Sequence, residues 1–292
     1  PSTHPVAPEA VEDTATALLN FDGISYAKGA SALRQLVAWL GDKDFLAGIN
    51  THFSRHRFGN ASLADFIDSL ARHTDRDMHA WAAAWLRTTG VDTFTPTLSG
   101  GDDAWTLDVR HTGERPHRLA IGLYDRAADE GDDVGRLLPR VRWERDFPAQ
   151  GGLTSIAGDG ARPALVLLND QDLSYAKVRL DAHSWDTAMG SLSGLADPLA
   201  RAVVWNAARD MVRDGELAPA SYLAAARTHL PRESDLAIVA GVLAFASRFV
   251  TGRYLSGDAR AAGLAVLTDL GRDLLRRTEG GEQPGLRLTA LS

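Results

Sequence analysis

Apolar residues repeat with the period of a helix over the first ninety positions of the chain. Leu33, Leu36 and Leu40 are spaced three and four positions apart, as on the buried face of an amphipathic helix. Gly41 follows them and is a typical helix stop. We therefore expect a helix from about Lys28 to Leu40.

Three more short helices are predicted before Gly90. Asp42 is expected to be the N-cap of the first of them. Ser62, with Asp65 three positions later, has the spacing of a capping box at the start of the second. The apolar faces expected for the three helices are Phe45, Ile49 and Phe53; Leu63, Phe66, Ile67 and Leu70; and Met78, Trp81, Ala82 and Trp85.

From Thr93 the hydrophobic period changes to two, which indicates half-buried strands. Trp105, Leu107 and Val109 alternate with polar residues, and the pattern returns at 119–123. Further strands are expected around Val141 and Trp143, at 164–168 and at 175–180. Short strands at this spacing predict a small antiparallel β-sandwich.

Beyond about Asp186 the pattern is helical again. Pro219 suits the first turn of one helix. The stretch 236–249 is apolar nearly all round, which predicts a helix buried between its neighbours. At 14 residues it is too short to span a bilayer. A further helix has one expected buried face, formed by Ala200, Val203, Val204, Ala207 and Met211.

These patterns predict an α+β multidomain chain. The expected units are helical residues 1–92, a β-sandwich at 93–185 and helical residues 186–292. A length of 292 residues agrees with this division, because single hydrophobic cores stop growing at roughly 250–300 residues.

Charge and composition narrow the function. The net charge of −7 is opposite in sign to that of a nucleic-acid-binding surface. The chain has no cysteine, which excludes disulfides, thiolate metal sites and a cysteine nucleophile. We expect a cytoplasmic monomer with no nucleic-acid or membrane partner. The first ten residues, PSTHPVAPEA, contain neither a signal peptide nor an initiator Met.

The histidines do not supply a recognisable catalytic metal motif. His52 and His56 have the four-residue spacing of a zinc-binding helix, but Phe53 stands where H-E-x-x-H requires its glutamate. We interpret both histidines as solvated or partly packed. The motifs G-x-S-x-G, G-x-G-x-x-G and the Walker loop are also missing.

One segment, FDGISYAKGAS at residues 21–31, changes this interpretation. It predicts an extended entry into the first helix, with Tyr26 near the helix start and Asp22 capping the turn. On pattern alone Tyr26 is a packed side chain with a satisfied hydroxyl. Lys28 is disfavoured by the dipole at a helix start, which allows a tertiary carboxylate partner or a role in positioning Tyr26.

This segment closely resembles the F-D-x-I-x-Y-x-K-G segment of the zinc aminopeptidases of the aminopeptidase N family. Other stretches resemble the family in the same order, particularly its actinobacterial-type members. They are HPV at 4–6, RFGNA at 57–61, WLR at 85–87, LLNDQDLSYAKV at 167–178 and WNAARD at 205–210.

The resemblance implies the helical end of a thermolysin-like catalytic domain, the family's β-sandwich, and the start of its superhelical C-terminal domain. It also implies a zinc enzyme that removes neutral or basic N-terminal residues from peptide substrates. Tyr26 matches the family's catalytic tyrosine, which stabilises the tetrahedral intermediate. The zinc motif H-E-x-x-H and the amine-binding motif G-x-M-E-N do not occur in these residues. We expect a fragment that begins after the zinc-binding motif, contains no metal ligands and is inactive alone.

An alternative remains open at this stage. The same domains without the metal centre would form a non-catalytic scaffold or a peptide-binding module. The upstream coding sequence distinguishes the two, because the enzyme requires both missing motifs in frame before Pro1.

Overall fold

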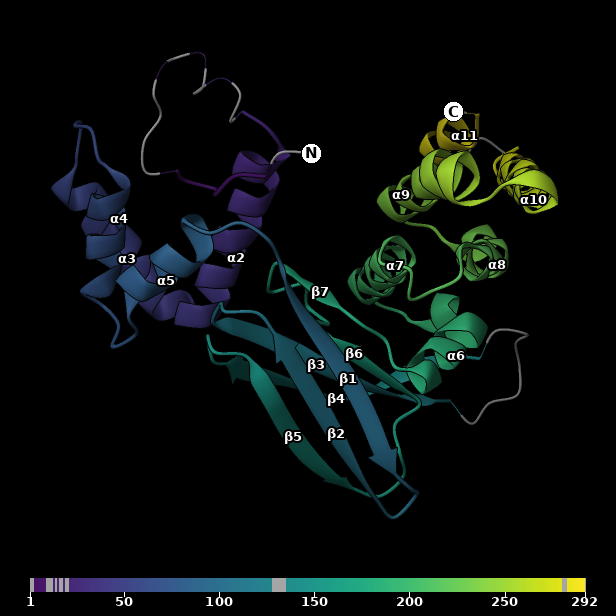
Figure 1. The fold of residues 1–292 in the computed structure, drawn as a ribbon, viewed down its shortest axis with the longest axis horizontal. Coiled ribbons are helices and arrows are strands. Elements are labelled where there is room, and N and C mark those ends of the chain that lie inside the picture. Colours follow the sequence, from purple (N-terminus) through teal and green to yellow (C-terminus); the bar gives the residue numbers. More distant parts are fainter. Residues whose placement is uncertain are drawn as a thin grey trace.

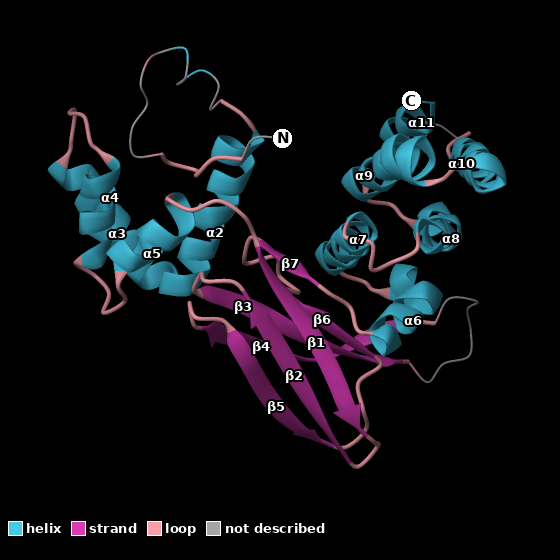
Figure 2. Ribbon diagram, viewed as in Figure 1, coloured by secondary structure: helices cyan, strands magenta, loops and turns pink. Residues whose placement is uncertain are grey.

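The computed structural model describes residues 3–8, 13, 15, 18, 21–127, 135–279 and 283–291. Two groups of helices flank a pair of β-sheets, and the order along the chain is helices, strands, helices (Figure 1). The predicted α+β architecture is confirmed. Figure 2 shows that helices and strands are segregated into separate parts of the molecule.

The N-terminal part contains the four predicted helices. The first begins earlier than expected, because a short π-helix continues directly into it. Ser62 and Asp65 form the predicted capping box, in which each side chain accepts a hydrogen bond from the other residue's backbone amide. The elements are η1 (Ile24–Lys28), α2 (Gly29–Leu40), α3 (Asp42–Arg55), α4 (Leu63–Ala71) and α5 (Met78–Leu86).

Two details predicted for α3 are wrong. Gly41, with φ of 83°, is its N-cap, and Asp42 is the first helical residue without a capping side-chain bond. Phe53 is 67% exposed rather than buried. The helix instead approaches α4 most closely at Gly48, where an added Cβ would lie 2.6 Å from the side chain of Leu70.

In the described residues, seven strands form two sheets that pack face to face, as predicted for a sandwich. The sheet orders are β5-β2-β1-β7 and β4-β3-β6. All neighbours are antiparallel except β7, which pairs in parallel with β1. The rings of Phe94 and Phe147, from opposite sheets, lie 5.0 Å apart. The strands are β1 (Asp92–Gly100), β2 (Ala104–Thr112), β3 (His117–Arg126), β4 (Leu137–Phe147), β5 (Gly152–Asp159), β6 (Leu165–Leu168) and β7 (Ala176–Val178).

The C-terminal part is helical, as expected. Pro219 occupies the first turn of α8, and the apolar face predicted around Val203 on α7 is buried. The elements are α6 (Ala182–Ser191), η2 (Leu192–Gly194), α7 (Pro198–Arg213), α8 (Pro219–His229), η3 (Leu230–Arg232), α9 (Leu236–Phe245), η4 (Ala246–Tyr254), α10 (Gly257–Arg277) and α11 (Pro284–Leu291).

The apolar helix near residue 240 differs from its prediction in length and burial. α9 continues into the π-helix η4, so the combined helix Leu236–Tyr254 has 19 residues. In the described part of the chain it is the one helix long and apolar enough to cross a membrane, with 39% of its most apolar window buried. Val239 and Phe245 are in the core, whereas Leu236 is 45% exposed. Helices in the core of globular domains have the same length and composition.

Candidate functional site

Tyr26 lies in the π-helix η1 and projects from the protein surface. Its side chain is 63% exposed, and its ring lies 5.9 Å from that of Phe21, which is also exposed. The packed side chain expected from pattern alone is therefore not what the fold provides. An exposed phenol held on a helix is available to a ligand.

Asp22 fixes the turn that carries Tyr26, as predicted. One carboxylate oxygen accepts hydrogen bonds from the backbone amides of Ile24 at 2.8 Å and Ser25 at 3.1 Å. The other oxygen lies 3.1 Å from His4 Nε2. The amide of Ser25, more than any other group, lowers the pKa of Asp22, so the carboxylate that caps the turn is stabilised in its ionised form.

Lys28 anchors the same helix, but not through a carboxylate. Its buried ammonium donates to the backbone carbonyls of Gly90 at 3.0 Å and Thr88 at 3.4 Å. It also lies 5.7 Å from the ring centre of Tyr175. Burial lowers the pKa of Lys28. Because these carbonyls follow the end of α5, Lys28 ties the helix of Tyr26 to the junction with the sandwich.

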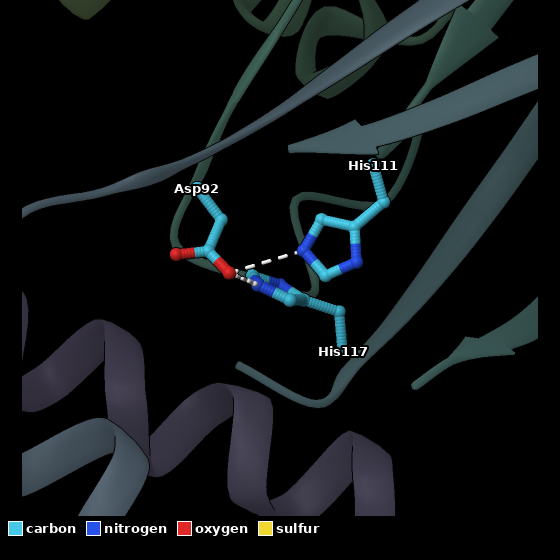
Figure 3. A group of neighbouring side chains, drawn as sticks. All are labelled: Asp92, His111 and His117. Carbon is cyan, nitrogen blue, oxygen red and sulfur yellow. Dashed lines mark hydrogen bonds and ion pairs between the residues drawn. The ribbon is translucent and has the colours of Figure 1, made fainter. Parts of the chain in front are cut away.

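A buried polar cluster lies at this junction and was not predicted. We call it the junction cluster; it comprises Asp92 at the start of β1, His111 on β2, Arg115 in the following loop and His117 at the start of β3. One oxygen of Asp92 lies 3.0 Å from His111 Nε2 and 3.2 Å from His117 Nε2 (Figure 3). The other oxygen forms an ion pair with the Arg115 guanidinium.

Arg115 connects the junction cluster to the N-terminal helices. Its guanidinium donates to the carbonyl of Ala84 at 3.2 Å, within α5. It also donates to the Thr88 hydroxyl at 2.7 Å and to the carbonyl of Thr89. The cluster therefore links the sandwich to the N-terminal helices through the hydrogen bonds of one buried, ion-paired guanidinium.

The charge states of the cluster follow from burial and hydrogen bonding. Burial opposes ionisation of Asp92, but hydrogen bonds from His111, His117 and the Arg115 amide outweigh it and lower the pKa of Asp92. Burial lowers the pKa of His117 more than its bond to Asp92 raises it. At neutral pH the cluster thus contains one ionised carboxylate, one guanidinium and a neutral His117.

The donor set does not fit a catalytic zinc ion. The Asp92, His111 and His117 ligand atoms lie within 4.8 Å of one another, and all three residues are buried. A catalytic zinc ion needs an open coordination position for water or substrate. The Arg115 guanidinium already neutralises Asp92, so a divalent ion would add uncompensated positive charge to a buried site. We interpret the cluster as structural.

The lowered pKa of His117 predicts a loss of stability in mild acid. Below the usual imidazole pKa of about 6.5, the unfolded chain binds a proton that folded His117 still refuses. Stability is therefore complete above this pH and decreases as the pH falls toward the folded pKa. The free energy of unfolding, measured with urea at about pH 7.5 and about pH 5.5, should differ less between the two pH values for His117→Gln than for the wild type. An equal difference in both proteins would contradict the prediction.

A signal for the junction cluster was present in the sequence. His111 follows Trp105, Leu107 and Val109 at the next inward position of β2. His117 precedes Leu119 on the inward face of β3 in the same way. Two inward histidines at the ends of paired regions indicated a buried polar contact. Their pairing with Asp92 and Arg115 depended on the fold.

His52 and His56 do not belong to either site. Their rings lie 5.0 Å apart at the C-terminal end of α3, and His52 also contacts Phe66 edge-on at 5.5 Å. Both residues are half-buried, which agrees with the prediction of partial packing.

Comparison with known proteins identifies the two helical parts. Residues 1–85 match the Peptidase family M1 domain, and residues 165–292 match the ERAP1-like C-terminal domain. Both matches place the chain in peptidase family M1. The chain belongs to the aminopeptidase N members of that family, as its motifs predicted.

Individual relatives agree with this assignment. Aminopeptidase N of Streptomyces lividans is 39% identical over 96% of this chain and 34% of its own length. Glutamyl aminopeptidase of Rattus norvegicus is 27% identical over 66% of this chain and 20% of its own length. Aminopeptidase N of Lactococcus lactis subsp. lactis is 38% identical over 39% of this chain and 12% of its own length. The chain thus spans about a third of the length of the Streptomyces relative.

Proposed function

We propose that this chain acts within a zinc-dependent aminopeptidase that removes N-terminal residues from peptides. The observation that carries the proposal is the exposed Tyr26 on a helix whose start is fixed by Asp22 and Lys28. The names of the relatives, aminopeptidase N and glutamyl aminopeptidase, support the same activity.

In this proposal Tyr26 stabilises negative charge on the substrate. Its hydroxyl donates a hydrogen bond to the oxygen of the scissile carbonyl as that oxygen becomes an oxyanion. The exposed position leaves the phenol free to meet the substrate. Asp22 caps the turn that begins this helix, and Lys28 ties the helix to backbone carbonyls that follow α5. The phenol that donates the hydrogen bond is therefore preorganised before the substrate binds.

Zinc would polarise the same carbonyl and activate the attacking water. Its proposed ligands come from an H-E-x-x-H motif that these 292 residues do not contain, and the junction cluster does not replace it. We therefore propose that the 292-residue chain alone neither binds zinc stoichiometrically nor hydrolyses peptides.

The test compares this chain with a longer polypeptide that includes the upstream coding sequence. The longer protein should hydrolyse an alanyl-anilide, lose the activity with a chelator and regain it with zinc. The 292-residue chain should show neither activity nor bound zinc by elemental analysis. Activity of the short chain, or no H-E-x-x-H motif upstream, would overturn the proposal and favour the non-catalytic scaffold.

A further inference from the structure

A short connection, residues 88–90 between α5 and β1, lies between the helix of Tyr26 and the junction cluster. On the helix side it is held by Lys28, the last residue of η1, whose ammonium donates to the carbonyls at both ends of the connection. On the sandwich side it is held by Arg115, which donates to the Thr88 hydroxyl at 2.7 Å and to the next carbonyl along the chain. The connection 88–90 therefore bridges two buried cations.

A second route leads from the sandwich back to the same helix. The Ser174 hydroxyl lies 2.7 Å from His117 Nδ1, and the ring of the next residue, Tyr175, lies 5.7 Å from the Lys28 ammonium. His117 Nε2 lies 3.2 Å from the Asp92 carboxylate, which is paired with the guanidinium of the first route. The two routes form a closed ring of contacts that begins and ends on the helix of the candidate site.

The first route depends on the shape of the Arg115 guanidinium. Its three nitrogens have different partners: Nη1 donates to Asp92, Nη2 to the connection 88–90, and Nε to the carbonyl of Ala84 in α5. A lysine ammonium would still neutralise Asp92, but it is a point charge on a flexible stem and does not present a planar fork. Charge balance and bridging are therefore separable at this position.

We propose that Arg115 is a positioning residue for Tyr26. It fixes the connection 88–90, and through this connection it fixes Lys28 and the helix that carries the phenol. The proposal rests on the proposed function, because it concerns how accurately the phenol meets the developing oxyanion. Placement matters for such a bond, since a shift of about 1 Å caused by a change far from the chemistry can lower turnover about 100-fold.

Arg115→Lys in the longer, zinc-containing enzyme tests the proposal. The lysine keeps a positive charge beside Asp92, so the buried carboxylate retains a counter-charge. With an alanyl-anilide as substrate, kcat should fall by about 10- to 100-fold. KM should change much less, because the phenol donates its hydrogen bond mainly in the transition state. An unchanged kcat would overturn the proposal.

The double variant Arg115→Lys with Tyr26→Phe separates positioning from general damage. If Arg115 acts through the phenol, its replacement should lower kcat no further once the hydroxyl is absent, because residues that act as a unit are strongly non-additive. A structural defect would lower kcat by the same factor in both backgrounds, and that result would overturn this proposal alone. Wild-type turnover in Tyr26→Phe would overturn the proposed function of Tyr26 and this proposal with it.

Lys28→Met breaks the same link without touching the buried ion pair, and it tests the proposal even if Arg115→Lys does not fold. It replaces a buried cation by an apolar side chain of similar length, so no charge is left unpaired. It should lower kcat by about 10- to 100-fold, and this loss should also disappear in the Tyr26→Phe background. A loss of equal factor in both backgrounds would contradict the link from Lys28 to the phenol.

The matched control is Arg76→Lys. Arg76 also joins the N-terminal helices to the sandwich, through an ion pair with Asp146 at 2.7 Å. The hydrogen bond and the ring contact of its side chain are with Asp146 and Trp39, not with the connection 88–90. This variant should keep the kcat of the parent enzyme. If it lowers kcat as much as Arg115→Lys does, any loosened contact between the two parts has the same effect, and Arg115 has no specific positioning role.

Discussion

Replacing Tyr26 by phenylalanine in the longer, zinc-containing enzyme is expected to lower kcat by about 100- to 1000-fold. The substitution removes one hydrogen-bond donor to the developing oxyanion and leaves the ring in place. Because the side chain is 63% exposed, its loss should not disturb packing. Steady-state kinetics with an alanyl-anilide measures the effect, with KM changing much less than kcat because the bond forms mainly in the transition state.

Tyr254→Phe is the matched control for this experiment. Tyr254 is also an exposed tyrosine in a π-helix, 40% exposed in η4, and its variant should keep the activity of the parent enzyme. Zinc content should be equal in all three proteins. Wild-type turnover in Tyr26→Phe would exclude Tyr26 as the oxyanion donor.

Asp92→Ala should cause a large loss of stability, about 3–5 kcal/mol. The substitution leaves the Arg115 guanidinium buried without its counter-charge. It also leaves the ring nitrogens of His111 and His117 without the carboxylate oxygen that they share. Urea unfolding followed by circular dichroism and tryptophan fluorescence measures the change. Trp85 lies beside the Arg115 guanidinium, so its fluorescence reports on the junction.

Asp125→Ala provides the comparison. Two guanidinium nitrogens of Arg140 donate to the Asp125 carboxylate, so this pair also has an arginine and an aspartate in direct contact. Unlike Asp92 and Arg115, both side chains are substantially exposed. An exposed pair contributes about 0–1 kcal/mol, so this variant should unfold close to the wild type. If Asp92→Ala costs no more than Asp125→Ala, the junction cluster does not hold the first two parts together.

The junction cluster also bears on the proposed domain boundaries at 92/93 and 185/186. Asp92 precedes the first boundary, whereas His111 and His117 follow it. The second boundary falls inside α6 (Ala182–Ser191). Limited proteolysis that cleaves near either position and leaves folded products would support the boundaries, which remain predictions.

Sequence patterns succeeded where local chemistry decides the structure. The capping box at Ser62 and Asp65 and the stop at Gly41 depend on groups within a few residues of each other. The exposed Phe53 was predicted incorrectly because helix periodicity does not reveal which neighbour packs against which face. Gly48, which decides that contact, leaves no trace in a hydrophobic pattern.

The sequence by itself determined the order of helices and strands, because this order depends on local spacing. Its resemblance to the aminopeptidase N family indicated the family and the position of Tyr26 in the family's motif. Only the tertiary structure decided that Tyr26 is exposed and that Lys28 is held by carbonyls some sixty positions away. It also brought Asp92, His111, Arg115 and His117 together. The buried charges of Asp92 and Arg115 are stabilised only when the ion pair and the hydrogen bonds to both histidines form together. Strand pairing, which no local sequence pattern specifies, places these four residues next to one another.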